Sequence, residues 1–146
     1  MSKRAEALRI RLAQAGERQQ LEDLQRRASL ALPDYREQLT AHPDAIHLPR
    51  DQIERGQVIV AELDGRMAGF AAVVENELDG LFVEPDLWRQ GIGSALIEAA
   101  THQARRDGLA LRVIASPTAR EFYESCGFSV EGEAATRFGP ALRMLR

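Results

Sequence analysis

The first third of the chain combines one short strand pattern with amphipathic helical patterns. Residues 8–12 alternate apolar and basic side chains strictly, which predicts a half-buried strand. From Glu17, apolar side chains recur at spacings of three and four until Pro33, which predicts an amphipathic helix. Residues 34–41 are predicted as a second short helix, and residues 42–50, which contain two prolines, as a loop.

The middle of the chain has the pattern of an antiparallel meander. Two apolar, β-branched runs, at residues 57–63 and 66–75, flank an Asp-Gly pair typical of two-residue hairpin turns. A third run follows at once, at residues 77–83. Since the turns are too short for a crossover helix, the three predicted strands pair antiparallel with their neighbours.

The last third returns to alternating helix and strand. Residues 91–107 are predicted to form a helix that Gly108 ends, and residues 111–115 a strand. Residues 118–126 form a short predicted helix, and the remainder one or two final strands. Together these elements predict one mixed α/β domain over residues 1–146, with a mostly antiparallel sheet of six to seven strands and about four helices.

Composition fits one globular domain. The chain has 146 residues, of which 45% are apolar and 28% charged. Its longest uninterrupted apolar run, residues 70–74, is far shorter than the roughly 18–20 residues of a membrane-spanning helix, and no apolar signal core follows the basic start. Cys126 is the only cysteine, which excludes an internal disulfide and a cysteine-based zinc site. We therefore expect a cytoplasmic protein without a membrane partner.

The net charge of −3 is unevenly distributed along the chain. Residues 51–95 carry three arginines against nine Asp and Glu side chains, whereas the two flanking segments are slightly basic. Because no block of Lys or Arg is present, the sequence argues against a nucleic-acid partner. Two interpretations of the acidic middle stay open: solvated turns and strand edges, or carboxylates that attract a cationic substrate.

The segment between the third meander strand and the long helix carries the strongest chemical signal. The predicted strand ends at Val83, Pro85 follows, and a glycine loop at residues 89–94, Arg-Gln-Gly-Ile-Gly-Ser, opens directly into the helix. Glycines let a ligand approach the backbone closely, and the first amides of a helix have no intrahelical partner and lie at the positive end of its dipole. This arrangement predicts a phosphate or pyrophosphate site.

Three widely used glycine motifs do not fit this loop. The dinucleotide-binding fingerprint requires a third glycine where the chain has Leu96, and the phosphate-binding loop of nucleotide hydrolases requires a Gly-Lys-Ser/Thr sequence that the chain lacks. The nucleophile elbow of hydrolases requires glycines on both sides of a serine, but Ile92 and Leu96 flank Ser94. The loop therefore belongs to another class of phosphate-binding site.

Two longer motifs include this loop and the short helix that follows it. The first combines Leu-Phe-Val-Glu-Pro at residues 81–85 with Trp-Arg-Gln-Gly-Ile-Gly at residues 88–93. The second is Ala-Arg-Glu-Phe-Tyr-Glu-Ser-Cys-Gly-Phe at residues 119–128. In this order and at this separation they resemble the GNAT superfamily of acyl-CoA-dependent N-acetyltransferases, and the resemblance spans roughly residues 8–133.

The resemblance implies a fold and a cosubstrate. The sheet would be twisted and splayed at the site of acetyl-CoA, whose pantetheine arm would lie along residues 77–83 like an added strand. The pyrophosphate would bind the main-chain amides of residues 89–94. The residues implied in acetyl-CoA binding are Leu81, Phe82, Val83, Arg89, Gln90, Gly91, Ile92, Gly93, Ser94, Ser116, Phe122 and Tyr123. Two positions depart from the family pattern, because Trp88 replaces its usual Gln or Arg and Ser116 replaces an Asn found in many members.

The resemblance also implies a reaction in which an amine attacks the acetyl thioester directly. A main-chain amide near Val83 would stabilise the oxyanion. Tyr123 occupies the family position of the acid that protonates the departing thiolate. The structural alternative for Tyr123 is a packing role beside Phe122.

A base is also needed, because a protonated amine cannot attack. Glu77 is the candidate, since some family members place a catalytic glutamate at this strand position. Strict alternation along the strand would put Glu77 and Asp79 on one face with Leu81 and Val83, so Asp79 competes for the role. A water chain is a third possibility for the base, and a solvated carboxylate at a turn is the structural alternative.

Other polar residues carry weaker signals. His42 and His47 have no accompanying cluster of carboxylates or cysteines, so no metal is expected. Arg26, Arg27 and Tyr35 lie in the two predicted helices that wall the acceptor site in the resembled family. They are candidates for binding an anionic part of the substrate, and a solvated helix face is the alternative.

The sequence thus predicts an acetyltransferase that moves an acetyl group from acetyl-CoA to a primary amine of a small molecule or peptide. The alternative is a non-catalytic acyl-CoA-binding module that acts as a sensor or interaction protein. The identity of the acceptor stays open, as does the oligomeric state, a homodimer included.

Overall fold

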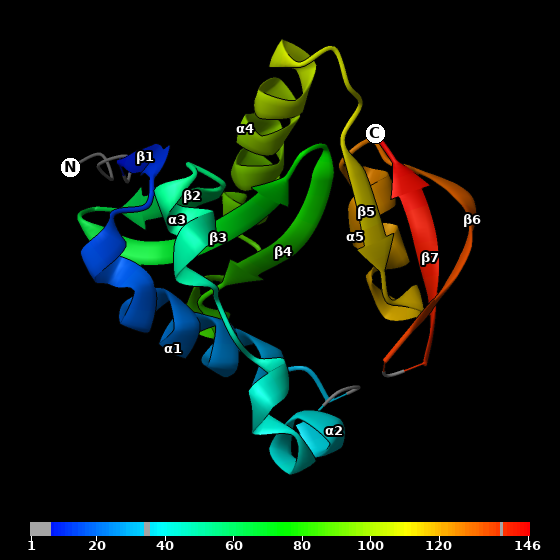
Figure 1. The fold of residues 1–146 in the computed structure, drawn as a ribbon, viewed down its shortest axis with the longest axis horizontal. Coiled ribbons are helices and arrows are strands. Elements are labelled where there is room, and N and C mark those ends of the chain that lie inside the picture. Colours follow the sequence, from blue (N-terminus) through cyan, green and yellow to red (C-terminus); the bar gives the residue numbers. More distant parts are fainter. Residues whose placement is uncertain (1–6, 34–35, 138) are drawn as a thin grey trace, which may run out of the picture.

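A computed structural model of the chain describes residues 7–33, 36–137 and 139–146. Its centre is a seven-stranded sheet in the order β1-β2-β3-β4-β5-β7-β6 (Figure 1). The strands are β1 (Leu8–Leu12), β2 (Val58–Leu63), β3 (Arg66–Val74), β4 (Glu77–Val83), β5 (Arg112–Ala115), β6 (Ser129–Thr136) and β7 (Gly139–Leu145). Neighbouring strands are antiparallel, except that β4 and β5 are parallel. The predicted mixed fold with a mostly antiparallel sheet is confirmed.

Five α-helices accompany the sheet in the described part of the chain. They are α1 (Arg18–Leu30), α2 (Arg36–Ala41), α3 (Arg50–Glu54), α4 (Ile92–Arg106) and α5 (Arg120–Ser125). Four 3₁₀ turns occur at Ala15–Glu17, Pro43–Ala45, Pro85–Leu87 and Pro117–Ala119. The sequence did not predict α3, because its five residues after Pro49 are too few to show an apolar periodicity. Residues 34–35, the start of the second predicted helix, lie outside the described residues.

A tight turn joins β2 to β3. Asp64 and Gly65 have φ angles of 51° and 80°, so both are left-handed. Two left-handed central residues are typical of a type I′ turn, whose twist matches that of the paired strands. Leu63 pairs with Arg66 across this turn, and the predicted hairpin is confirmed.

Helices α1 and α4 cover opposite faces of the sheet (Figure 1). On the α4 face, Leu96 and Ile97 are fully buried in a cluster with side chains of β2, β3 and β5. On the α1 face, Leu21 and Leu24 pack in a second cluster around Phe70. Because close-packed side chains hold the central strands from both sides, the end of β4 has a fixed position.

The sheet divides between β4 and β5. In the described structure these two strands pair at two positions, Glu77 with Arg112 and Leu78 with Val113. Beyond this point they separate, and β5 runs with β7 instead (Figure 1). The later half of β4 therefore has a strand neighbour on its β3 side alone.

An irregularity interrupts β4 close to this division. Leu78 lies opposite Val73 on β3. The next pair joins Gly80 to Ala72, so Asp79 is an extra residue with no counterpart. This is a β-bulge, and it shifts the alternation of side chains between the two faces.

The bulge overturns the prediction that Glu77, Asp79, Leu81 and Val83 share one face. Leu78 belongs to the cluster beneath α4, and Leu81 and Val83 pack against the same cluster. Glu77 is the neighbour of Leu78 and therefore faces the opposite side from Leu81 and Val83. The alternation is interrupted by the bulge, and the side-chain pattern of the sequence gives no sign of a bulge.

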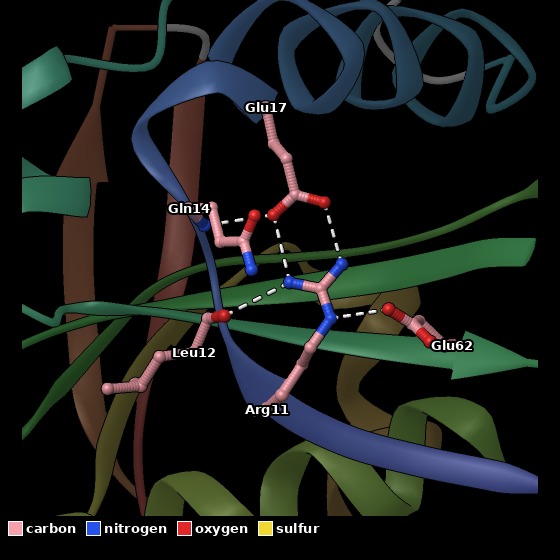
Figure 2. A network of polar contacts seen from close by, with 5 residues as sticks. All are labelled: Arg11, Leu12, Gln14, Glu17 and Glu62. Atoms are coloured by element: carbon pink, nitrogen blue, oxygen red, sulfur yellow. Dashed lines mark hydrogen bonds and ion pairs between the residues drawn. The ribbon is translucent and has the colours of Figure 1, made fainter. Parts of the chain in front are cut away.

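The first strand forms one edge of the sheet, where Arg11 fastens it (Figure 2). Arg11 donates two hydrogen bonds to Glu17, at 2.8 and 2.6 Å, and a third to Glu62 on β2. Hydrogen bonding to Glu17 raises the pKa of Arg11, and the same contact lowers the pKa of Glu17. The network ties β1 to the start of α1. The apolar side chains of β1 are exposed, so the strand is confirmed but is not half-buried.

Candidate active site

The glycine loop has the backbone that a ligand site at the start of α4 requires. Gly91 directly precedes the helix with a φ of 81°, and Arg89 has a φ of 66°. A Cβ at Gly91 would meet no atom within 4 Å, so this position faces open space. Left-handed steps beside a helix start are typical of main-chain sites that bind anions.

Gly93 brings the two sequence motifs into contact. A Cβ at Gly93 would lie 3.1 Å from the ring of Phe122, closer than most real Cβ contacts. Phe122 belongs to the second motif, on α5, and Gly93 to the first, on α4. The small residue therefore lets the first turn of α4 pack directly against α5.

A cavity of about 610 Å³ opens between the end of β4, the glycine loop and α5. Of the twelve residues that the resemblance implies for acetyl-CoA binding, eleven line this cavity, and Gln90 does not. The other lining residues are Ala28, Ser29, Leu32, Leu87, Trp88, Thr118 and Ala119. The resemblance implied that the first helix walls the acceptor site, but it did not identify Ala28 and Ser29 as lining residues, because small side chains on a helix look alike whether they face a cavity or the core.

The end of β4 directs backbone groups into this cavity. The Glu84 N–H donates to the Ala68 carbonyl at 2.8 Å, and the bonding direction alternates along an antiparallel pair. The main-chain groups of Leu81 and Val83 therefore point away from β3. The indole N–H of Trp88 donates to the Val83 carbonyl at 2.8 Å, so this carbonyl already has a hydrogen-bond partner. The remaining amides and carbonyl suit an extended arm that itself carries amide groups.

A second cavity, of about 300 Å³, adjoins the first. The two share seven lining residues: Ser29, Leu32, Leu81, Phe82, Ser116, Ala119 and Tyr123. Most of the other walls are apolar and come from α2, β4 and β5. Among the described lining residues of the small cavity, Asp79 is the one carboxylate. The two cavities therefore adjoin along these shared walls.

Tyr123 lies where the two cavities meet. Its ring makes edge contacts with Phe122 and Phe128, with centroids 5.2 and 5.3 Å apart. Burial, and to a smaller extent the nearby Cys126, raises the pKa of the Tyr123 hydroxyl above its usual range. The hydroxyl is therefore a neutral hydrogen-bond donor at ordinary pH. Tyr123 thus packs beside Phe122 and also lines both cavities.

The two candidate bases occupy different places. Asp79 is exposed at the small cavity, and its Oδ2 accepts a hydrogen bond of 3.4 Å from Gln52 Nε2 on α3. Glu77 begins β4, opposite Val74 and beside Arg112, and is absent from the lining of both described cavities. The structure thus places Asp79, and not Glu77, in the lining of the small cavity, which Tyr123 also lines.

Two small polar side chains complete the described lining. The hydroxyls of Ser116 and Thr118 lie 3.1 Å apart at the end of β5, where Ser116 lines both cavities. The Cys126 sulfur lies 3.6 Å from the Ser94 hydroxyl, behind the first turn of α4. Cys126 lines neither cavity.

The remaining sequence candidates do not add to the site. Arg27 is paired with Glu84 while its side chain stays about half exposed, and Tyr35 lies outside the described residues. In residues 7–33, 36–137 and 139–146, no three His, Cys, Asp or Glu side chains gather closely enough to share a metal ion. Within the same ranges, no helix is both long enough and apolar enough for a bilayer crossing.

Comparisons with known sequences extend from α2 to β7. The sequence profile of the Acetyltransferase (GNAT) domain matches residues 31–141. Two relatives come from Escherichia coli (strain K12): the uncharacterized N-acetyltransferase YafP is 34% identical over 79 residues, and the peptidyl-lysine N-acetyltransferase YiaC is 37% identical over 90 residues. These matches cover 54% and 60% of this chain, and 50% and 60% of the lengths of YafP and YiaC.

Solved structures share the fold. The apo form of YjaB from Escherichia coli superimposes with a TM-score of 0.75 at 24% identity, over 95% of this chain and 97% of YjaB. The PaiA N-acetyltransferase from Thermoplasma acidophilum, in complex with coenzyme A, gives a TM-score of 0.73 at 20% identity, over 94% and 98% of the two chains. The profile match contains the splayed strands, the glycine loop and Tyr123. This chain is a member of the GNAT acetyltransferase family.

Proposed function

We propose that the protein transfers an acetyl group from acetyl-CoA to a primary amine. The observation that carries this proposal is that two adjoining cavities share Tyr123 as a lining residue. The large cavity has the glycine loop and the end of β4 among its walls, and the small cavity has the Asp79 carboxylate. A donor and an acceptor that enter from these two sides meet beside a protonated hydroxyl.

Main-chain groups bind the donor in this proposal. The amides of residues 89–94 hold the pyrophosphate, where a Cβ at Gly91 would point into open space. The amides of Leu81 and Val83 bind the pantetheine arm, and the Val83 amide is the candidate for stabilising the oxyanion. Acetyl-CoA supplies the thioester carbonyl that the amine attacks, and coenzyme A leaves as a thiol.

Tyr123 is the proposed acid. Its raised pKa keeps the hydroxyl protonated, so it donates a hydrogen bond that strengthens as negative charge develops on the departing sulfur. A neutral donor in a largely apolar wall has little competition from water. Proton transfer from the hydroxyl, or from the attacking nitrogen, then yields the free thiol.

Asp79 is the proposed base, in preference to Glu77. It lies in the small cavity, where an incoming ammonium group would meet one negative charge. Asp79 accepts the proton of the amine directly or through one water molecule. Glu77 precedes the bulge and does not line the small cavity. The contact with the cavity that supports Asp79 as the base is therefore lacking for Glu77.

The acceptor that suits the small cavity is an amine on an apolar stem. Its walls are mostly apolar, with Leu32, Leu39 and Leu81 among them, and its one described carboxylate can accept one cationic head. A lysine side chain in a peptide has this chemistry, and the relative YiaC is named for that acceptor. A polyamine or aminoglycoside has several cations and calls for several carboxylates.

The test is thiol release from acetyl-CoA in the presence of lysine peptides, polyamines and amino acids. Calorimetry measures acetyl-CoA binding separately. Thiol release that needs both the protein and an amine supports the proposal. Binding without release would favour the non-catalytic module, and absence of binding would reject the donor site as well. The Tyr123→Phe variant is the matched control, because it should bind acetyl-CoA and react slowly.

A further inference from the structure

Glu84 is a buried carboxylate at the point where β4 ends. It directly follows Val83, and it is 8% exposed. With Thr101, it is one of two buried polar residues in the described part of the chain. A carboxylate out of water requires a charged or hydrogen-bonding partner to stay ionised, so the identity of its partner is informative.

Arg27, near the end of α1, is this partner. Its Nε donates to Glu84 Oε1 at 3.0 Å, and its Nη2 donates to Oε2 at 2.8 Å. Two parallel bonds between planar groups fix both the separation and the orientation of the segments that carry them. Here those segments are 57 residues apart in the sequence.

The pair lies directly behind the walls of both cavities. Arg27 precedes Ala28 and Ser29, which line the large cavity, and Ser29 also lines the small one. On the other side, Glu84 follows Val83, whose amide points to the donor site. Each partner of the ion pair is thus the chain neighbour of a cavity-lining residue.

Apolar packing alone fixes the end of α1 less well than its beginning. Leu21 and Leu24 are fully buried but lie in the first two turns of the helix, and the buried apolar residue of its later turns is the small Ala28. Leu32, just beyond the helix, is exposed. Apolar contacts are non-directional, so they permit a small tilt of the last turns that a bidentate ion pair resists.

We propose that Arg27 and Glu84 are positioning residues that hold the α1 wall of the two cavities against the end of β4. In this role they set the distance between the acceptor amine in the small cavity and the donor thioester in the large one. The inference rests on the proposed acetyl transfer.

The chain contains a matched control pair. Arg66 Nη1 and Nη2 donate to the two carboxylate oxygens of Asp86, both at 3.1 Å. Asp86 lies two residues beyond Glu84, in the same loop, but Arg66 begins β3, so this pair joins the loop to β3 and not to α1. The two arginine side chains are about equally exposed, at 52% for Arg66 and 54% for Arg27, whereas the side chain of Asp86 is 63% exposed and that of Glu84 11%. The control pair therefore has the same chemistry but does not join α1 to the end of β4.

The test compares Arg27→Met with Arg66→Met. In Arg27→Met we expect kcat/KM for the amine to fall about tenfold, while the Kd for acetyl-CoA changes less than about twofold. Amide hydrogen exchange in the last turn of α1 should become faster in this variant. Arg66→Met should leave all three quantities within about twofold of the wild type.

Two further variants separate positioning from loss of the fold. Arg27→Lys keeps the positive charge but cannot form the two parallel hydrogen bonds of the guanidinium group, so we expect a loss of about threefold in kcat/KM. Glu84→Gln in the Arg27→Met background should cost little more, because the two substitutions break the same contact. Thermal melting of each variant confirms that it is folded.

The outcomes distinguish this inference from the proposed function. Unchanged exchange in α1, or faster exchange with an unchanged kcat/KM for the amine, would overturn the inference alone. An equal loss in the Arg66→Met variant would also overturn it, since general loop stability would then explain the effect. A wild-type protein that binds acetyl-CoA but acetylates no amine would overturn the proposed function, and the catalytic part of the inference with it.

Discussion

The wall of the cleft formed by β4 and the glycine loop differs in kind from the wall formed by β5 and α5. The first presents main-chain amides and carbonyls, from Leu81, Val83 and residues 89–94. The second presents side chains, above all Ser116 and Tyr123. A main-chain group is present whatever the residue, whereas a hydroxyl exists only where a particular residue stands. Substitutions should therefore act through backbone shape on the first wall and through lost functional groups on the second.

Trp88 contacts the main-chain wall at one carbonyl. It stands where the resembled family usually has Gln or Arg, and the loop after it has left-handed residues at Arg89 and Gly91. Its indole N–H donates to the Val83 carbonyl, and the residue is 39% exposed.

The largest effect should come from the side-chain wall. Tyr123→Phe removes one hydroxyl and keeps the ring contacts with Phe122 and Phe128. We expect single-turnover thiol release to slow by about 10²–10⁴-fold, with little change in the Kd for acetyl-CoA. Release at a wild-type rate when chemistry limits turnover would reduce Tyr123 to a packing residue.

The same variant has a pH signature. Because burial raises the pKa of Tyr123, the wild-type acid stays protonated until the pH exceeds the usual tyrosine value of about 10. Activity due to this acid should therefore be lost only above that pH, and the Phe variant should lack that falling limb. A wild-type limb below the usual value would contradict the assignment.

The next largest effect should come from backbone shape on the main-chain wall. Gly91→Val forces a β-branched residue into a φ of 81° and directs its side chain into the open space of the cavity. We expect calorimetry to show acetyl-CoA binding weakened at least about tenfold, or about 1.4 kcal/mol.

Gly108→Val is the matched control for this prediction. Gly108 follows the other end of α4 with a φ of 73°, and a Cβ there would also meet no atom within 4 Å. Both variants should lose stability, but Gly108 lines neither described cavity, so acetyl-CoA affinity should persist. Equal losses of affinity in the two variants would remove the support for the loop as the pyrophosphate site.

A smaller effect is expected at the two carboxylates. Asp79→Asn should lower kcat/KM for a cationic amine about tenfold, because a nearby water can replace part of its function as a base. Glu77→Gln should stay within about twofold, since Glu77 lines neither described cavity. The comparison is made by steady-state kinetics with one amine at fixed ionic strength. The reverse order of effects would restore Glu77 as the base.

The smallest effect is expected at Trp88. Trp88→Phe removes the hydrogen bond to Val83 and keeps an aromatic ring, and Trp88→Gln restores the usual family residue. We expect both to change the Kd for acetyl-CoA by no more than about threefold, because backbone amides carry the binding. A tenfold loss in either variant would show that this wall also depends on a side chain.

Local sequence patterns were sufficient for much of the fold, including the elements that border the cleft. The hairpin at Asp64 and Gly65, the glycine loop and the helix that carries Tyr123 each depend on residues within a few positions of one another. The bulge at Asp79 was not predictable, because its cause is the pairing with β3 and not the composition of β4. Because of this bulge, the prediction that Glu77 shares a face of the sheet with Leu81 and Val83 was wrong.

Long-range contacts account for most of the remainder. The Arg27–Glu84 pair joins segments 57 residues apart, and each charge looks like an ordinary solvated residue in the sequence. The same holds for Ser29, whose place in both cavities follows from how α1 lies across the sheet. The periodicity of apolar residues identifies the helices and strands, but contacts between distant elements can be identified only in the folded structure.

The brief pairing of β4 with β5 has a consequence for how the protein melts. Within the sheet, two residue pairs join the block of β1–β4 to the block of β5–β7, and the cluster beneath α4 is another link between them. A ligand in the large cavity touches both blocks, because β4 and α5 both line it. It should therefore couple the two halves as well as raise Tm by mass action. In scanning calorimetry, saturation with coenzyme A should turn a broad endotherm into one narrower peak.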